Sequence, residues 1–278
     1  GRALVTFQVI ALKGTPYAWH PGSIEGMEKL TVEDLQEFHR RHYVPNNAVL
    51  TVAGDVKAEE VFELVRKYFG PIPKGEVPPA VSVGAPEQSG MQEETLEMPV
   101  RLPAVLAGYR LPGAAHPDIP ALELLGYVLF EGESSRLHKR LVREQRIATF
   151  AGGDTLLFKE AGLLLFFAFF DAEEQEPEKV KEALLAELEK LTLESVVDRE
   201  LQRAKNQLSA QYTFNLDSLL SVANGLVNAE VLEGSWREFL KSKYESTTAA
   251  DLKRVAQTYF KRENLVVVTI KPQEGGGQ

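Results

Sequence analysis

The chain has 278 residues, which suits about two domains of ordinary size. Its 44% hydrophobic and 26% charged residues are typical of soluble globular proteins with sizeable cores. A formal net charge of −9 argues against a nucleic-acid or anionic-membrane surface. The absence of cysteine excludes disulfides, thiolate catalysis and cysteine-ligated zinc.

The first well-marked elements lie between residues 31 and 91. Thr31 and Asp34 form a near capping box for a helix over 31–42, and Pro45 ends that helix. The following "NNAVLTVAGD" predicts a strand, and residues 58–70 predict an amphipathic helix closed by a glycine. Residues 71–90 are rich in proline and glycine and indicate an interdomain linker.

The rest of the chain mixes strands and helices. Strands are expected at about 93–98 and 103–110, a helix at about 117–130, and strands near 148–157 and 162–170. The apolar run "AGLLLFFAFF" at 161–170 is too short to span a bilayer and indicates a buried strand. Mostly helical sequence then extends to about residue 260, and "NLVVVTIKP" forms a last strand.

An internal repeat links the two halves of the chain. The segment "TVEDLQEFHRRHYVPNNAVLTVAGDV" aligns without gaps with "TTAADLKRVAQTYFKRENLVVVTIKP" when Thr31 is placed on Thr248, the second letter of that stretch, so that each pair is 217 positions apart. Chance similarity is the alternative, but cap, apolar face and turn residue agree in register. Because the second copy begins near residue 92, an equally long first copy would begin about 125 residues before Gly1.

The repeat defines the predicted organisation. We expect an α+β protein with a duplicated domain, each copy an antiparallel sheet packed by helices. Residues 1–73 would be the C-terminal part of the first copy, 74–91 the linker, and 92–278 the complete second copy.

Two clusters could carry chemistry. His39 and His42 share one helical face, but zinc at a catalytic site needs at least three protein ligands, and the repeat replaces the pair by Ala256 and Tyr259. We therefore interpret them as ordinary surface histidines. The second cluster is "FEGESSRLHKRLVREQRIATFAGG", whose arginines recur at helical spacing; composition alone favours a solvated basic face. No serine triad, phosphate-binding loop or dinucleotide fingerprint is present.

These segments carry a family resemblance. The stretch from "GTPYAWHPGSIEGMEKL" through "RRHYVPNNAVLTVAGD", together with "EGESSRLHKRLVREQRIATF", resembles the pitrilysin/insulinase family of zinc peptidases, which includes the mitochondrial processing peptidase. The resemblance implies duplicated α+β domains enclosing a chamber. It also implies a zinc site of the HxxEH type, which is absent from this sequence and would lie upstream or in a partner subunit.

The resemblance also assigns candidate site residues. In catalytic members the second domain contributes an Arg and a Tyr seven residues apart that face the zinc. The Arg matches Arg143, a candidate for oxyanion stabilisation or substrate positioning. The Tyr position is occupied by Phe150, which lacks the hydroxyl and is not expected to be catalytic.

The leading hypothesis is the C-terminal part of a zinc metallopeptidase that is inactive by itself and binds no metal. The alternative is a non-catalytic or substrate-binding subunit of a heterodimeric peptidase or processing complex; an unrelated α+β binding module is a third possibility. The expected partners are a peptide substrate and a related subunit in a homo- or heterodimer, with no nucleic acid and no membrane span. The expected compartment is the periplasm or cytoplasm of a bacterium.

Overall fold

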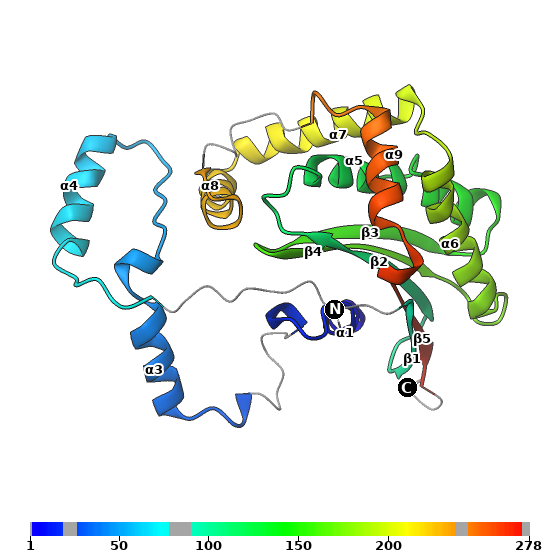
Figure 1. Cartoon of the computed structure of the whole chain (residues 1–278), viewed down its shortest axis with the longest axis horizontal. Helices are drawn as coiled ribbons and strands as arrows, with labels where there is room; N and C mark the ends of the chain where they lie inside the picture. Colours follow the sequence, from blue (N-terminus) through cyan, green and yellow to red (C-terminus); the bar gives the residue numbers. More distant parts are fainter. Residues whose placement is uncertain (1, 19–26, 78–89, 237–243, 274–278) are drawn as a thin grey trace. The chain divides into compact units, whose positions relative to one another are not determined.

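The computed structural model describes residues 2–18, 27–77, 90–236 and 244–273 (Figure 1). It consists of two compact units: one of residues 1–19, 83–212 and 242–278, and a second of residues 20–82 and 213–241. Most of the predicted linker, residues 78–89, lies outside the described residues. The boundaries at 73 and 91 therefore stay a prediction.

The first unit is built on a five-stranded sheet. Its strands are β1 (Gln92–Met98), β2 (Ala104–Pro112), β3 (Phe150–Leu157), β4 (Ala161–Phe169) and β5 (Leu265–Pro272), in the order β1-β5-β2-β4-β3. Only the β1–β5 pair is parallel, and the other pairs are antiparallel. The predicted α+β class with a mainly antiparallel sheet is confirmed, and each strand lies close to its predicted range.

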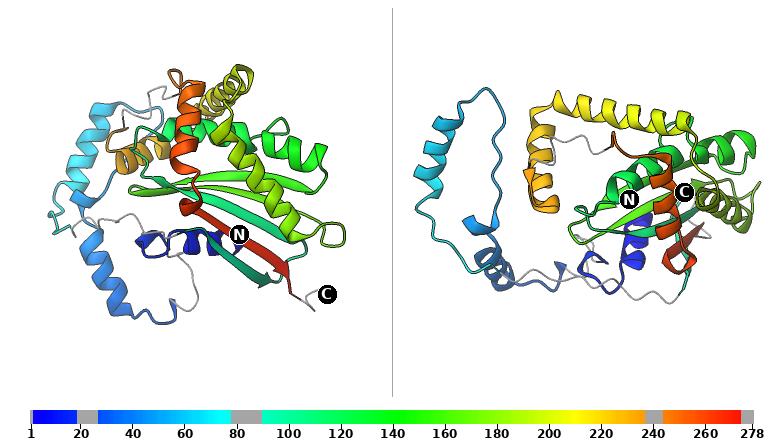
Figure 2. Two further views of the ribbon diagram at one scale, coloured as in Figure 1. Left: turned by 45° about the vertical axis from the view of Figure 1, so that its right-hand side comes forward. Right: turned by 45° about the horizontal axis from the view of Figure 1, so that its top comes forward.

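One face of this sheet is covered by helices (Figure 2). These are α5 (Ile119–Phe130), α6 (Pro177–Leu193) and α9 (Ala249–Tyr259), with α7 (Asp198–Leu216) contributing to the same core. The strands present alternate residues to this core, for example Phe166 and Ala168 of β4 and Val267 of β5, all fully buried. Successive side chains of a strand point to opposite faces of the sheet, so every second residue of each strand reaches this core.

The opposite face of the sheet is packed by α1 (Arg2–Ala11). Phe7 and Ala11 of this helix are buried against Leu106 and Val268, residues of the other strand face. Gly108 makes the approach possible, because a Cβ at that position would lie 2.9 Å from the Phe7 ring. The helix covers only part of this sheet face.

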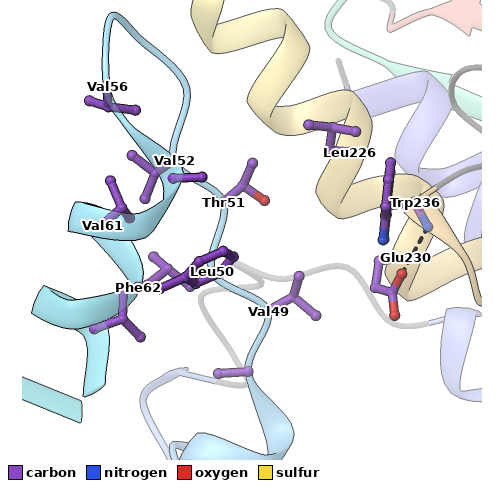
Figure 3. A pocket seen from close by; sticks show the side chains of 13 residues that line it. Val49, Leu50, Thr51, Val52, Val56, Val61, Phe62, Leu226, Glu230 and Trp236 are labelled. Carbon is purple, nitrogen blue, oxygen red and sulfur yellow. Dashed lines mark hydrogen bonds between the residues drawn. The ribbon is translucent and has the colours of Figure 1, made fainter.

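The second unit contains α3 (Val32–His42), α4 (Ala58–Phe69) and α8 (Leu219–Glu233). The strand predicted after α3 is wrong for this structure, since residues 48–53 have no regular secondary structure. A strand needs hydrogen-bonding neighbours, and no described segment pairs with these residues. They instead line an apolar pocket of ≈ 650 Å³ with residues of α4 and with Leu226 and Trp236, as Figure 3 shows.

The repeat is reproduced in the local geometry of the two helix starts. Thr31 donates its backbone N–H to Asp34 Oδ2 at 2.9 Å, and Asp34 donates its own to Thr31 Oγ1 at 3.1 Å. The corresponding distances at Thr248 and Asp251 are 2.8 and 3.2 Å. Both helices therefore begin with the same reciprocal capping box.

The two helix ends agree as well. Each helix is followed by a short 3₁₀ turn, η2 (Pro45–Asn47) and η5 (Arg262–Asn264). The Asn47 side chain donates to the His42 carbonyl at 2.9 Å, and Asn264 donates to the Tyr259 carbonyl at 2.9 Å. Such side-chain closure at equivalent positions is hard to reach by chance, and it supports the predicted duplication.

The apolar faces of α3 and α9 differ in how far they are buried. Leu252 and Val255 of α9 are fully buried, whereas the equivalent Leu35 and Phe38 of α3 are 57% and 55% exposed. Likewise β5 lies between β1 and β2, while its equivalent at residues 48–53 has no strand beside it among the described residues. The local sequence thus forms the same caps and turns in both places, and among the described residues a sheet follows the second of them alone.

Candidate functional site

The candidate site is built on the segment that joins α5 to β3. Gly132 has φ 75°, in the left-handed region that a residue without Cβ enters freely, so the chain reverses directly after α5. Ser135 closes the turn by donating its N–H to the Gly132 carbonyl at 3.0 Å. Arg203 of α7 reaches back and donates to the Ser134 carbonyl. The loop is thereby fixed to the helical layer.

The loop leads into η3 (His138–Glu144), a π-helix. Its wider turn is shown by the Gln145 N–H, which donates to the Arg140 carbonyl five residues back at 2.9 Å. Arg146 then takes φ 53°, an uncommon left-handed conformation for a residue with a side chain, and the chain turns toward β3. Because π-helices are rare and concentrate at functional sites, this segment is a natural place for a site residue.

The arginines that recur in this segment do not form one basic face. Arg136 donates through Nε and Nη2 to Glu200 of α7, at 2.9 and 2.7 Å. This two-pronged bond raises the pKa of Arg136. Burial opposes ionisation of Glu200, but the bond and charge of Arg136 keep the pKa of Glu200 below its ordinary value. Arg136 is thus a structural anchor.

The other two arginines have separate partners. Arg140 donates to Glu144 at 2.5 Å and lies 3.8 Å from the buried Glu187. Arg143 donates to Glu133 of the loop, and its side chain is 57% exposed. Of the three, Arg143 is the most exposed, so its guanidinium is the most accessible to a ligand.

Phe150 begins β3 and is 54% exposed. Its ring packs on Phe167 and Phe169 of β4, with centroid separations of 5.9 and 6.4 Å. Arg143 and Phe150 contact different groups, Arg143 a carboxylate and Phe150 an aromatic row. Phe150 offers a surface for packing but no hydrogen-bond donor.

Two rings of this aromatic row, Phe167 and Phe169, also line a small apolar pocket beside α1. This pocket of ≈ 350 Å³ is lined by Phe167 and Phe169 together with Leu4 of α1, Met98 and other apolar residues of the sheet. Its volume is near the lower end for ligand pockets, roughly 300–1,000 Å³. The open part of this sheet face is therefore apolar, and it adjoins Phe150.

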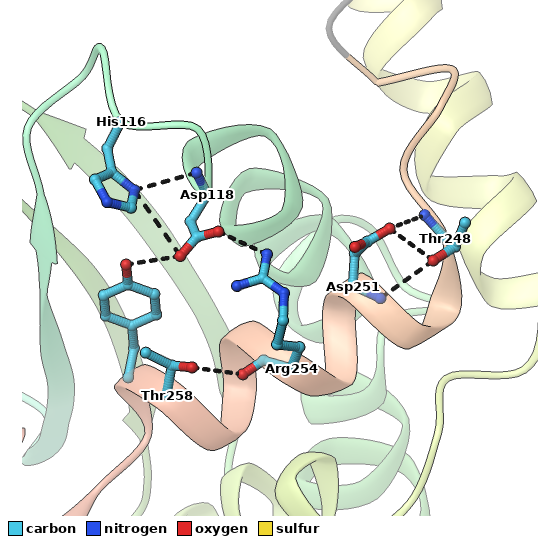
Figure 4. A network of polar contacts seen from close by, with 7 residues as sticks. His116, Asp118, Thr248, Asp251, Arg254 and Thr258 are labelled. Atoms are coloured by element: carbon cyan, nitrogen blue, oxygen red, sulfur yellow. Dashed lines mark hydrogen bonds and ion pairs between the residues drawn. The ribbon is translucent and has the colours of Figure 1, made fainter.

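A second polar cluster joins the start of α5 to α9 (Figure 4). The Asp118 carboxylate accepts from Arg254 at 2.6 Å and from the Tyr259 hydroxyl at 2.9 Å, and His116 Nδ1 lies 3.9 Å away. The Arg254 bond, with that of Tyr259, outweighs burial and lowers the pKa of Asp118. The bonds from Arg254 and Tyr259 link the start of α5 to α9, so the cluster holds these two helices together.

Sequence reasoning missed the acidic partners in both places. Glu133, Glu200 and Asp118 were not singled out, because their partners are 10, 64 and up to 141 residues away. A single sequence contains no local pattern that predicts ion pairs between residues so far apart. The spacing of the arginines was the available local signal, and it identified the arginine of each ion pair in residues 130–153 but no member of the Asp118 cluster.

The described residues do not form a metal centre. The His42 ring stacks on Phe38 with centroids 4.3 Å apart, and the His39 ring stacks on Tyr43 at 4.7 Å. Within the described ranges, no group of three or more His, Asp or Glu residues could hold a metal ion. The His39 and His42 pair therefore does not fit a zinc site, which needs at least three protein ligands.

Comparison with known proteins decides the family. Residues 29–208 match the peptidase M16 inactive domain, which is more than half of the chain. The chain belongs to the peptidase M16 family. The predicted pitrilysin-type resemblance is thereby confirmed.

Relatives and solved structures agree with this M16 assignment. Zinc protease PqqE of Helicobacter pylori is 32% identical over 92% of this chain and 59% of its own length. A probable mitochondrial-processing peptidase subunit beta of Arabidopsis thaliana is 24% identical over 90% of this chain and 49% of its own. A crystal structure of a Helicobacter pylori protease matches with a TM-score of 0.85 and 28% identity, over 98% of this chain and 67% of that one.

The M16 chain spans about 60% of the length of the first curated relatives it matches. In the part of the chain that the structure covers, no helix combines the length and apolarity needed to cross a bilayer.

Proposed function

We propose that this chain supplies the second, non-zinc-binding domain of an M16 zinc metallopeptidase and that Arg143 acts there on the peptide substrate. The observation that carries the proposal is the position of Arg143, exposed at the end of a π-helix within the region that matches the M16 inactive domain. A guanidinium placed there can donate charge-assisted hydrogen bonds to a carbonyl oxygen or to the oxyanion that develops from it.

Phe150 has a different part in this proposal. Lacking a hydroxyl, it cannot donate to the same oxygen, so it would contribute apolar contact only. Its exposed ring and the apolar pocket beside Phe167 and Phe169 are suited to packing against a substrate. The proposal thus leaves polar contact with the substrate to Arg143.

The zinc and the remainder of the first domain are proposed to lie outside the described residues, either in the same polypeptide or in a related subunit. The exposed apolar face of α3 supports this, because the equivalent apolar residues of α9, Leu252 and Val255, are fully buried. The proposed domains are residues 1–73, 74–91 and 92–278, with the two copies enclosing a chamber. A tightly bound zinc at one ion per chain, measured by metal analysis of the purified chain, would contradict the proposal.

A second candidate function is a non-catalytic subunit that binds peptide or completes a complex. Phe150 favours it, since the family position carries tyrosine in catalytic members. The Arabidopsis relative carries the word subunit in its name, which supports an assembly of related chains. In this case Arg143 would have no part in cleavage. The periplasm or cytoplasm of a bacterium remains the predicted compartment under both candidates.

Peptide cleavage separates the two candidates. The chain is assayed alone and then with a zinc-bearing M16 subunit, using an internally quenched peptide, as wild type and as Arg143→Ala. Cleavage that appears only with the partner and is lost in the variant supports the catalytic role. Cleavage that is the same with both proteins assigns the chain to the non-catalytic candidate. Phe150→Tyr is a further arm, in which a rise in kcat would show that the missing hydroxyl limits the reaction.

A further inference from the structure

We propose that Glu133 is a positioning residue for Arg143, holding its guanidinium in the loop until an oxygen of the substrate takes over the contact. The inference rests on the proposed function, in which Arg143 meets the peptide. It assigns a role to a residue that neither the family motif nor the repeat singles out.

The first support is the contact itself. Arg143 donates through Nη2 to Glu133 Oε2. Arginine carries five N–H donors in a planar fork, and this contact engages one nitrogen. Arg136, by contrast, commits Nε and Nη2 together to Glu200. Glu133 therefore directs the guanidinium without occupying the whole of its donor edge.

The second support is the fixed backbone beneath Glu133. Its carbonyl oxygen lies 3.3 Å from His138 Nδ1, the next carbonyl along the chain accepts from Arg203, and Gly132 and Ser135 close the turn around it. Because the backbone is anchored on both sides, only the glutamate side chain has to be ordered when the pair forms. The fixed backbone thus lowers the ordering cost of the Glu133–Arg143 pair.

The third support is the difference in exposed fraction among the glutamate side chains that pair with the three arginines. Glu200, which accepts from Arg136, has a side chain that is 24% exposed. Arg140 lies between Glu144 and Glu187, whose side chains are 38% and 4% exposed. The side chain of Glu133 is 76% exposed. Exposed ion pairs are weak and exchange readily, whereas a buried carboxylate cannot give up its partner without a large penalty. Of the three arginines, Arg143 has the most exposed ion pair, and it therefore exchanges its partner most readily.

Chemical modification tests the contact without any cleavage reaction. The intact chain is treated with phenylglyoxal, and adducts at each arginine are quantified by mass spectrometry. Glu133→Gln should raise the modification rate at Arg143 about two- to fivefold, the range expected for losing an exposed pair. Glu144→Gln is the matched control, because Glu144 lies on η3 but pairs with Arg140. It should raise the rate at Arg140 and leave Arg143 unchanged.

Two results would overturn the inference: an unchanged Arg143 rate in Glu133→Gln, or an equal rise in Glu144→Gln. Glu133→Asp, which keeps the charge, should restore most of the protection. Circular dichroism verifies that each variant is folded, as expected for a side chain that is 76% exposed.

The kinetic arm uses the assembly with the zinc-bearing subunit. Glu133→Gln should lower kcat about two- to fivefold with little change in KM, and it should have no additional effect in an Arg143→Ala background. A full additional loss in that background would show that Glu133 acts independently of Arg143 and would overturn the inference. If Arg143→Ala leaves cleavage unchanged, the proposed function fails, while the modification result still decides whether Glu133 holds Arg143.

Discussion

Replacing Leu252 by alanine should destabilise the first unit strongly, while the same change at Leu35 should not. The two residues occupy equivalent positions, the fourth residue after the threonine cap in each helix. Leu252 is fully buried where α9 packs against α5 and α6, and Leu35 is 57% exposed. The pair therefore compares one local sequence context in two environments.

The expected magnitudes follow from burial. Leu→Ala in a filled core loses the transfer free energy of the removed methyl groups and leaves a cavity, and together these cost about 2–5 kcal/mol. At a site more than half exposed, most of that transfer term is absent, and surface changes usually stay within about 0.5 kcal/mol. We therefore expect the free energy of unfolding to fall by about 3 kcal/mol in Leu252→Ala and to change little in Leu35→Ala.

Urea unfolding followed by far-UV circular dichroism measures the difference. Because the two units can unfold separately, hydrogen exchange at the amides of β2 and β5 reports specifically on the unit that contains Leu252. A loss below about 0.5 kcal/mol in Leu252→Ala, or one above about 2 kcal/mol in Leu35→Ala, would refute the reasoning from burial.

The same pair tests the proposed duplication. If a longer gene product supplies the sheet missing from the first copy, Leu35 becomes a core residue there. Leu35→Ala should then cost about as much as Leu252→Ala, about 3 kcal/mol. An unchanged small effect in the full gene product would mean that α3 has no such cover.

Two further predictions concern the first unit. Because the folded-state pKa of Asp118 is lowered, its ionised form contributes stability above the unfolded pKa near 3.8, and this contribution is lost as pH falls through the folded value. Asp118→Asn should therefore cost about 1 kcal/mol at pH 7 and progressively less as the pH falls below 3.8, as measured by urea unfolding across that range. Gly153→Ala should cost roughly 1–3 kcal/mol in the same assay, since its Cβ would lie 2.3 Å from the Phe130 ring; a stability equal to that of wild type would show that α5 yields to the extra methyl group.

The elements of the first unit were largely predictable from the sequence. Runs such as "AGLLLFFAFF", the capping residue Thr248 and the closing Asn264 act locally, so periodicity and cap chemistry locate them. The segment 48–53 has the same local signals but no strand, because strand formation depends on a partner that local sequence does not contain. Pairing is a tertiary property.

The candidate site was predictable only in part. Arg143 and Phe150 followed from the family resemblance, while periodicity alone favoured a solvated basic face. The structure instead gives each arginine its own carboxylate, through a π-helix and a loop held by Arg203. A π-helix has no simple sequence signature, and the partner Glu200 is 64 residues from Arg136. These features emerge from packing.

Peptide cleavage by the assembly of this chain with a zinc-bearing M16 subunit tests the central claim most directly. We expect Arg143→Ala to lower kcat by about 10²-fold, the usual effect of removing one oxyanion donor. Lys139→Ala, a change at an exposed cation on the same π-helix, should leave kcat unchanged. Equal kcat values for wild type and Arg143→Ala would contradict a role for this domain in catalysis.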